Sequence, residues 1–341
     1  MSLKRTKPIL NNIHFCGSIL KKSDSLTTLG VTISQDLSWS KHITNIIAKA
    51  SKRLTIVKRY RSKLPRVALE KLYICMIRPV LEYGDILFDN CPDSIARPLE
   101  NVQRQAAIVC TNAYKHTSYK NLLHELNWEP LHTRRKMHRL VTYYKIYHKI
   151  YPQYLHDLLQ TPQPINYNLR NRPTTIPRFT RLSSSFTSYF PQTARDWNEL
   201  NISIRNAQSV TIFKTKIRGS SNFNPYHRLC TKRPGVWLTR IRLGLSPLNH
   251  QRYCYNFIDS PLCNACNLAP ETPLHYFLLC PAYNGARAHL LQQLGTIPAV
   301  NTADFEVLMN TIIKGTNLHP REIPDFLNTI YTYMKDTDRF K

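Results

Sequence analysis

The sequence predicts a mainly α-helical protein with a short N-terminal β-hairpin, a helical bundle, a linker, and a small module of cysteine and histidine residues followed by helices. Apolar residues recur at helical spacing through residues 38–150 and again through residues 305–334. Alternating apolar residues within 13–33 indicate short strands. At 341 residues the chain is long enough for two or three cores of ordinary size.

Residues 1–36 are expected to end in the hairpin. Ile13 and Phe15 would lie on one strand, and Val31 and Ile33 on the other. The polar stretch KKSDS would form the turn between them. After this point the apolar period changes to that of a helix.

Residues 37–160 are expected to form the helical bundle. Two amphipathic helices lie on either side of Pro65, which suits the first turn of the second helix. Further helical patterns cover residues 95–110, 119–126 and 131–150. These patterns together predict a bundle of about five helices.

The second half of the chain divides by composition. Residues 161–181 carry four prolines and no acidic residue, which predicts an extended linker. Residues 182–232 form a connector whose pattern does not distinguish helix from strand. A cysteine-containing module is expected at residues 233–300, and two amphipathic helices are expected within residues 301–341.

The cysteine cluster has the ligand types of a metal site. Its pattern, Cys263-x2-Cys266-x8-His275-x4-Cys280, has the spacing of a structural Cys3His zinc site. Four protein ligands fill a tetrahedron and leave no position for a water, so we expect a structural Zn²⁺ and no catalytic ion. A short helix from Pro273 would deliver His275, with Cys280 binding from its end. The alternative is that reduced cysteines pack in a core beside a satisfied histidine.

The chain is strongly basic, with 47 Lys and Arg residues against 21 Asp and Glu residues and a formal net charge of +26. Residues 41–66 and 130–156 contain no acidic residue at all. Helix faces of one sign are better explained by phosphate contacts than by ordinary mixed-sign pairing, although a solvated basic face is the open alternative. We therefore expect RNA or DNA as a partner. The candidate contacts are Lys49, Lys52, Arg53, Lys58, Arg59, Arg61, Lys63, Arg134, Arg135, Lys136 and Arg139.

Several classes of function find no support in the sequence. None of the nine glycines lies in a phosphate-binding loop, and no two aspartates are adjacent. The nucleophile elbow and the zinc-protease helix motif are also absent. We find no membrane-spanning run and no secretory signal, so we expect an intracellular protein, cytoplasmic or nuclear, that binds neither a membrane nor a small-molecule substrate.

The stretches LGVTISQDLSWSKHITNIIAKASKRL, LEKLYICMIRPVLEYGDILF and SYFPQTARDWNEL precede the cysteine cluster in this order. Together they resemble the carboxy-terminal third of the reverse-transcriptase polyprotein of non-LTR retrotransposons, of the jockey-like type, over nearly the whole chain. The resemblance implies that residues 11–34 end the polymerase palm, that residues 38–160 form the thumb, and that the cysteine cluster is a zinc knuckle. Residues 238–249, LTRIRLGLSPLN, are similar to the segment before that knuckle, which makes Arg240 and Arg242 candidate phosphate contacts.

The chain departs from this family at its catalytic motifs. The Phe/Tyr-Ala-Asp-Asp motif has no counterpart here, and Pro324-Asp325 lacks the spaced acid and lysine of a nuclease motif that some relatives carry. The resemblance therefore implies a nucleic-acid-binding fragment without polymerase activity of its own, with the upstream part of the polyprotein as a further partner. Two alternatives stay open: a host-adopted nucleic-acid-binding or adaptor protein, and an active polymerase or nuclease fragment.

Overall fold

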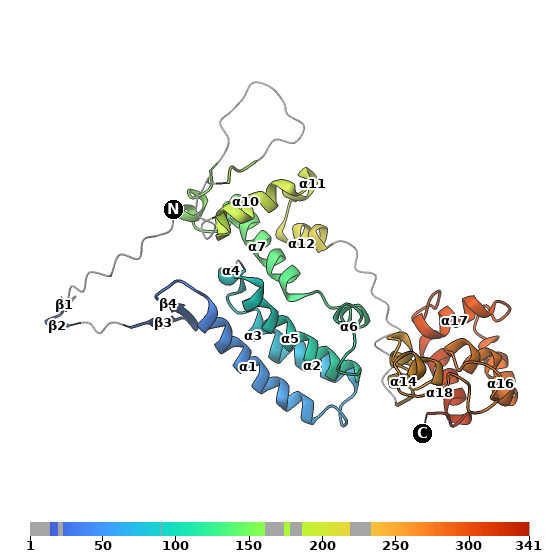
Figure 1. Cartoon of the computed structure of the whole chain (residues 1–341). Helices are drawn as coiled ribbons and strands as arrows, with labels where there is room; N and C mark the ends of the chain where they lie inside the picture. The colour runs from blue at the N-terminus through green and yellow to red at the C-terminus, as the bar shows by residue number, and fades with distance from the viewer. Residues whose placement is uncertain are drawn as a thin grey trace. The chain divides into compact units, whose positions relative to one another are not determined.

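The computed structural model describes residues 14–19, 23–89, 91–160, 174–177, 186–218 and 233–340. These residues are mainly helical, as the sequence predicts, and their strands form two separate antiparallel pairs (Figure 1). They cluster into two compact units, each assembled from segments that are distant in sequence. The first contains the described parts of Met1–Ser51, Arg78–Val102 and Glu129–Ser221, and the second those of Lys52–Ile77, Gln103–Trp128 and Asn222–Lys341.

The N-terminal strands form two hairpins, and the prediction of one hairpin turning at KKSDS is wrong. β1 (His14–Phe15) pairs with β2 (Ser18–Ile19), and β3 (Ser25–Thr28) pairs with β4 (Val31–Ser34). The second hairpin turns at Leu29 and Gly30, whose φ angles are 49° and 78°. A two-residue turn with both φ angles positive matches the right-handed twist of the strands, which is why the chain reverses here.

The helices of the first half lie where the apolar period places them. The buried side of α1 contains the expected residues Ile43, Ile46, Ala50, Leu54 and Val57, and also His42. The helix expected after Pro65 is interrupted by a π-helical turn. In chain order the elements are α1 (Ser40–Arg59), α2 (Arg66–Leu72), η1 (Tyr73–Ile77), α3 (Arg78–Leu81), α4 (Asp85–Phe88), α5 (Asp93–Thr111), α6 (Tyr119–Leu126), α7 (Leu131–Tyr147) and α8 (Gln153–His156).

The described part of the connector, residues 186–218, is helical and packs against α7. It forms α10 (Tyr189–Glu199), α11 (Ile202–Arg205) and α12 (Val210–Arg218). Trp197 and Phe213 are fully buried in a core shared with Tyr143 and Tyr144. Most of the predicted linker lies outside the described residues, but Trp197 Nε1 donates to Thr174 Oγ1 at 2.9 Å, so this part of the stretch packs on α10.

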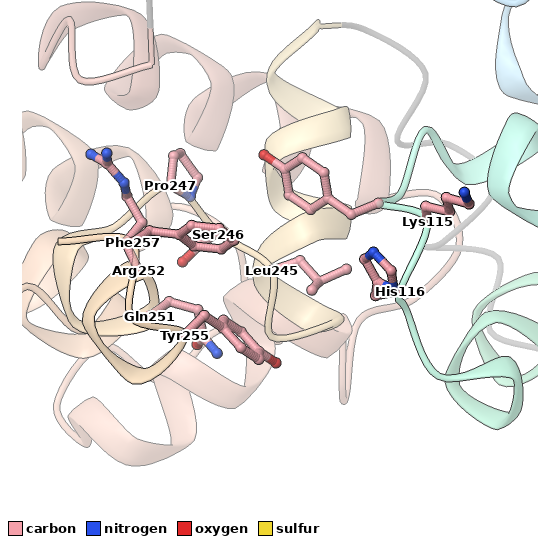
Figure 2. A pocket seen from close by; sticks show the side chains of 10 residues that line it. Lys115, His116, Leu245, Ser246, Pro247, Gln251, Arg252, Tyr255 and Phe257 are labelled. Carbon is pink, nitrogen blue, oxygen red and sulfur yellow. The ribbon is translucent and has the colours of Figure 1, made fainter.

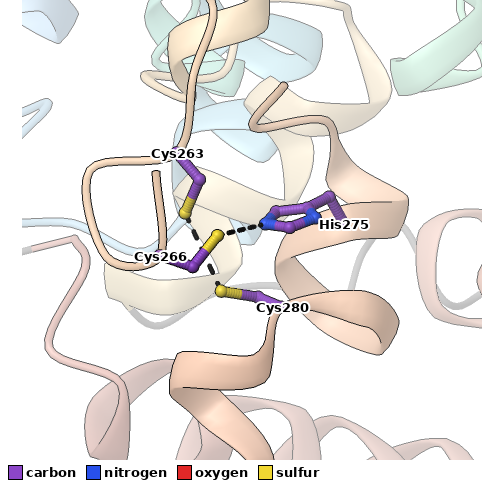
Figure 3. Close-up of side chains that lie close together, drawn as sticks. All are labelled: Cys263, Cys266, His275 and Cys280. Carbon is purple, nitrogen blue, oxygen red and sulfur yellow. Dashed lines mark hydrogen bonds between the residues drawn. The ribbon is translucent and has the colours of Figure 1, made fainter. Parts of the chain in front are cut away.

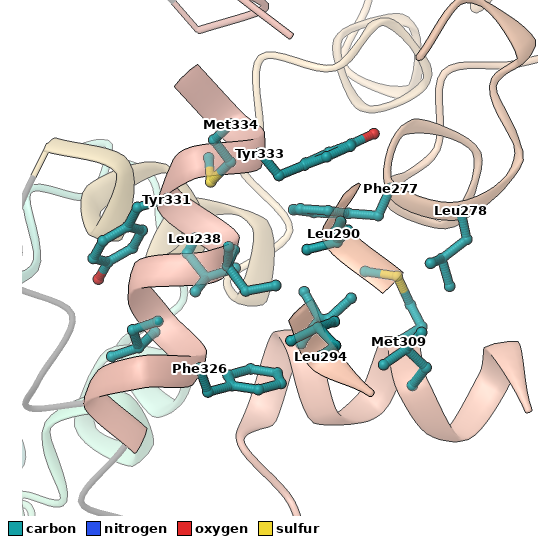
Figure 4. Close-up of a cluster of buried hydrophobic side chains, with 14 of the residues drawn as sticks. Leu238, Phe277, Leu278, Leu290, Leu294, Met309, Phe326, Tyr331, Tyr333 and Met334 are labelled. Carbon is teal, nitrogen blue, oxygen red and sulfur yellow. The ribbon is translucent and has the colours of Figure 1, made fainter. Parts of the chain in front are cut away.

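The C-terminal part forms one core. Its elements are α14 (Arg233–Arg242), α15 (Asn249–Cys254), η2 (His275–Leu279), η3 (Pro281–Tyr283), α16 (Asn284–Leu294), α17 (Phe305–Lys314) and α18 (Ile323–Asp336). Figure 4 shows side chains from α14, η2, α16, α17 and α18 meeting in this core. The rings of Phe277 and Tyr333 stack with centroids 5.6 Å apart, which joins the turn that carries His275 to the last helix. No described helix is both long enough and apolar enough to span a membrane.

Candidate metal centre

The four predicted ligands come together at one point. One ligand atom each from Cys263, Cys266, His275 and Cys280 can be chosen so that all four lie within 4.8 Å of one another (Figure 3). Cys263 Sγ lies 3.8 Å from Cys280 Sγ, and Cys266 Sγ lies 3.3 Å from His275 Nε2. The four residues are therefore close enough to bind a metal ion.

These separations are compatible with a tetrahedral metal site and are too long for a disulfide. In a tetrahedral site with Zn–S bonds of about 2.3 Å and Zn–N bonds of about 2.0 Å, two sulfurs lie about 3.8 Å apart and a sulfur and a nitrogen about 3.5 Å apart. A disulfide would need sulfurs about 2.05 Å apart. The distances of 3.8 Å and 3.3 Å match the tetrahedral values.

The first two ligands lie on a tight backbone loop. Leu262 and Pro270 form a β-bridge across its base, and Cys263 N–H donates to Ala269 O at 2.9 Å. Asn267 adopts a left-handed conformation with φ of 57°, which allows the sharp turn after Cys266. The backbone N–H of Leu268 donates to Cys266 Sγ at 3.5 Å and lowers the pKa of that thiol, which favours the thiolate that a metal binds.

A π-helical turn brings the other two ligands together. Residues five apart do not face each other on an α-helix, but the bond of a π-helix joins residues at this spacing. Here Cys280 N–H donates to His275 O at 2.7 Å at the end of η2. Pro281 follows and begins η3. The x4 spacing between His275 and Cys280 is thus accommodated by one π turn, which is a form that often occurs at functional sites.

Burial sets the protonation of these ligands. It lowers the pKa of His275, which favours the neutral ring that can ligate a metal. It also raises the pKa of the Cys280 thiol to about 12, so a metal ion must displace this proton when it binds. Metal binding at this centre is therefore coupled to proton release.

A buried carboxylate ties the metal-binding loop to both ends of the C-terminal part. Glu271 is 0% exposed and accepts hydrogen bonds from the Asn249 backbone N–H at 2.7 Å and from Arg339 Nε and Nη2 at 2.5 and 2.7 Å. Asn249 Nδ2 in turn donates to Leu262 O and to Asn264 Oδ1, both at 2.6 Å. We call Asn249, Glu271 and Arg339 the clasp. No sequence pattern predicts the clasp, because its members are far apart along the chain.

Of the predicted basic contacts on α7, only Lys136 is well exposed, and its predicted role stays a prediction. Arg135 and Arg139 are buried and pair with Asp89, with Arg135 Nε 3.5 Å from Oδ1 and Arg139 Nε 2.9 Å from Oδ2. Lys136 and Arg139 pair with Asp196, and Arg134 pairs with Glu82. The assignment of Arg134, Arg135 and Arg139 as phosphate contacts is corrected, because their guanidinium groups are engaged by carboxylates inside the protein.

Two arginines of α14, Arg240 and Arg242, also make contacts within the protein. Arg242 donates to both carboxylate oxygens of Glu125, at 3.0 and 2.7 Å, and the same carboxylate accepts from Arg66 at 2.7 Å. Arg240 donates to Asn112 O at 3.2 and 3.1 Å, and its guanidinium lies over the rings of Tyr114 and Trp237. Both residues therefore connect segments of the second unit. The Arg242 side chain is only 5% exposed, which corrects its assignment as a phosphate contact. Arg240 is half-buried, and its assignment stays a prediction.

The basic residues of α1 and the following turn, unlike the buried arginines of α7 and α14, are exposed. Arg53 donates to Met76 O at 2.6 Å, and Arg61 donates to Asn112 Oδ1 at 2.8 Å, although both side chains stay exposed. The other predicted contacts in this region are exposed and form no ion pair within the part of the chain that the structure describes. They are Lys49, Lys52, Lys58, Arg59 and Lys63.

A comparison of the chain with protein-family models, curated proteins and solved structures finds no match.

Proposed function

We propose that this chain binds the phosphate backbone of RNA or DNA through the exposed basic residues of α1, and that a structural zinc ion at the Cys3His cluster maintains its C-terminal part. The resemblance to the thumb and knuckle of non-LTR reverse transcriptases supports the same function. The proposal assigns binding to this chain and no polymerase chemistry.

The observation that carries the proposal is how the charges are distributed. Acidic residues in the interior, among them Glu70, Glu82, Asp89, Glu125 and Glu271, are engaged by arginines. Among the described residues, the excess of basic over acidic side chains must therefore lie largely on the surface. A surface of one sign repels itself unless a polyanion neutralises it.

The geometry of α1 suits contacts with successive phosphates. Lys41, Lys52 and Arg59 are exposed on the side opposite the buried residues Ala50 and Leu54. At a rise of about 1.5 Å per residue, Lys41 and Arg59 lie about 27 Å apart along the axis. Contacts of this kind are sequence-independent and weaken with salt.

The test is the salt dependence of binding to a short fluorescent RNA–DNA hybrid, followed by anisotropy. The double variant Lys52→Gln/Arg59→Gln should weaken binding and reduce the slope of log affinity against log salt by about two. The matched control is Arg321→Gln/Lys335→Gln, which removes the same charge from exposed positions of the C-terminal part. Equal slopes for the two double variants, or no salt dependence in the unmodified chain, would refute the proposal.

A further inference from the structure

A pocket of about 600 Å³ lies within the second unit, between the loop after α5 and the C-terminal ends of α14 and α15. Its volume is within the range of about 300–1,000 Å³ that is usual for ligand sites. Lys115 and His116 lie on one side of it, and Tyr255 and Phe257 on the other (Figure 2).

The helix ends that form the pocket have capped backbones. Gly244 ends α14 with φ of 68°, and the N–H groups of Gly244 and Leu245 donate back to carbonyls of this helix at 3.0 and 2.7 Å. Asn256 ends α15 with φ of 56°, and the N–H groups of Asn256 and Phe257 donate back to carbonyls of that helix, both at 2.9 Å. Both ends are Schellman motifs, so their backbones are fixed before any ligand arrives.

The loop on the opposite side is held as firmly. The Arg240 guanidinium lies 4.7 Å from the centroid of the Tyr114 ring and donates to Asn112 O. Arg104 Nη2 donates to the carbonyls of Lys115 and Thr117 at 3.3 and 3.2 Å. A site whose parts are fixed in advance loses little conformational entropy when it binds.

The lining combines aromatic surface with positive charge. Tyr255 and Phe257 are 53% and 74% exposed, which is costly for large apolar rings unless a ligand covers them. Lys115 and Arg252 are exposed and form no ion pair in the described part of the chain, and no carboxylate lines the pocket. The Ser246 hydroxyl, on a residue only 5% exposed, has no hydrogen-bond partner among the described residues.

We infer that this pocket binds one unpaired nucleotide of a single-stranded nucleic acid. The base would stack on the exposed rings, and its phosphate would lie near Lys115 and Arg252. A duplex cannot use this site, because its bases are stacked on one another and paired. The inference rests on the proposed nucleic-acid binding and adds a preference for single strands that phosphate contacts on α1 would not give.

The experiment compares two fluorescent ligands, a single-stranded oligonucleotide and an RNA–DNA hybrid of the same length, on the full chain. The variant Tyr255→Ala/Phe257→Ala should weaken binding of the single strand about tenfold, with unchanged binding of the hybrid. Tyr253→Ala is the control, because Tyr253 is an exposed aromatic residue on the neighbouring α15 that does not line the pocket. Tyr255→Phe should bind like the unmodified chain, since it keeps the ring.

A second variant checks the charge. Arg252→Gln should reduce the salt slope of single-strand binding by about one and leave that of the hybrid unchanged. If the ring and charge variants bind single strands as the unmodified chain does, the pocket does not bind an unpaired nucleotide. Binding of the hybrid then tests the proposed phosphate contacts of α1 separately. Loss of affinity for both ligands to the same extent would also overturn the inference.

Discussion

The clasp offers a direct test of how the C-terminal part is held together. In the variant Arg339→Met the Glu271 carboxylate loses its charged partner and keeps the Asn249 N–H as its remaining donor in the clasp. Removing one member of a buried pair commonly costs about 3–5 kcal/mol, because the other charge is left without compensation. Since natural domains have unfolding free energies of about 5–15 kcal/mol, this loss would be a large part of the total.

The assay is urea unfolding of the zinc-loaded protein, followed by far-ultraviolet circular dichroism. With a urea dependence of about 2 kcal/mol per molar, the loss should lower the midpoint of the corresponding transition by about 2 M. Arg321→Met, at an exposed position, is the control and should change stability by less than about 0.5 kcal/mol.

The double variant Glu271→Met/Arg339→Met separates a penalty for the unpaired charge from a general loss of packing. It should be more stable than Arg339→Met alone, because it no longer buries an unpaired carboxylate. Two outcomes would refute this account of the clasp: a cost below about 1 kcal/mol for Arg339→Met, or simply additive costs in the double variant.

Two further predictions concern the metal and the pH. Chelation of the metal, or the variant Cys263→Ser, should unfold the C-terminal part, because structural zinc contributes about 10–16 kcal/mol in small zinc domains. The control Cys254→Ser changes an exposed cysteine and should keep its zinc by elemental analysis. Folding that survives chelation would contradict the prediction. The buried His42 accepts a hydrogen bond from Thr32 N–H at Nδ1, and burial lowers its pKa below the ordinary 6.5, so its contribution to stability should be complete above this pH and fall as the pH drops toward the lowered pKa. The variant His42→Gln should show a smaller loss of melting temperature between about pH 7 and about pH 5, and an equal loss would count against this.

The sequence predicted the helices well because their period follows from their burial. On α1 the apolar residues that recur at helical spacing, such as Ile46, Ala50 and Leu54, are the ones that are buried, so their period predicts both the helix and its buried face. The prediction of the hairpin was wrong because its turn does not follow from an apolar pattern. Its register depends on the positive φ of Leu29, a residue type that rarely adopts this conformation, and the polar stretch before it was the stronger turn signal.

At the candidate metal centre, the sequence predicted the four residues that cluster but not the hydrogen bonds of the clasp that hold their loop. The spacing identified all four, since the loop and the turn that carry them are local. The clasp joins Glu271 to Arg339 and Asn249, and no local pattern links positions so far apart. The one feature of the sequence that could have indicated the clasp was the single acidic residue between Cys266 and His275, which is Glu271.

The basic stretches show why local charge counting divides the residues wrongly. The segment around Arg135 and Arg139 contains no acid, yet their partners Asp89 and Asp196 lie outside it in sequence and reach it through the fold. The planar guanidinium of arginine suits such buried pairs, whereas lysine is more strongly hydrated and favours the surface. The exposed group on α1 and its turn is accordingly rich in lysine.

This division decides which variants can test binding at all. Arg139 and Arg242 have side chains only 3% and 5% exposed, and each pairs with a buried or partly buried carboxylate. Replacing either one would leave that carboxylate short of its partner, so a loss of nucleic-acid affinity would report a damaged fold. Replacing Lys52 or Arg59 removes charge and no described ion pair, so a change in salt slope with unchanged melting temperature would report a contact. A variant series built on acid-free stretches alone would mix these two effects, and only the pairing observed in the fold separates them.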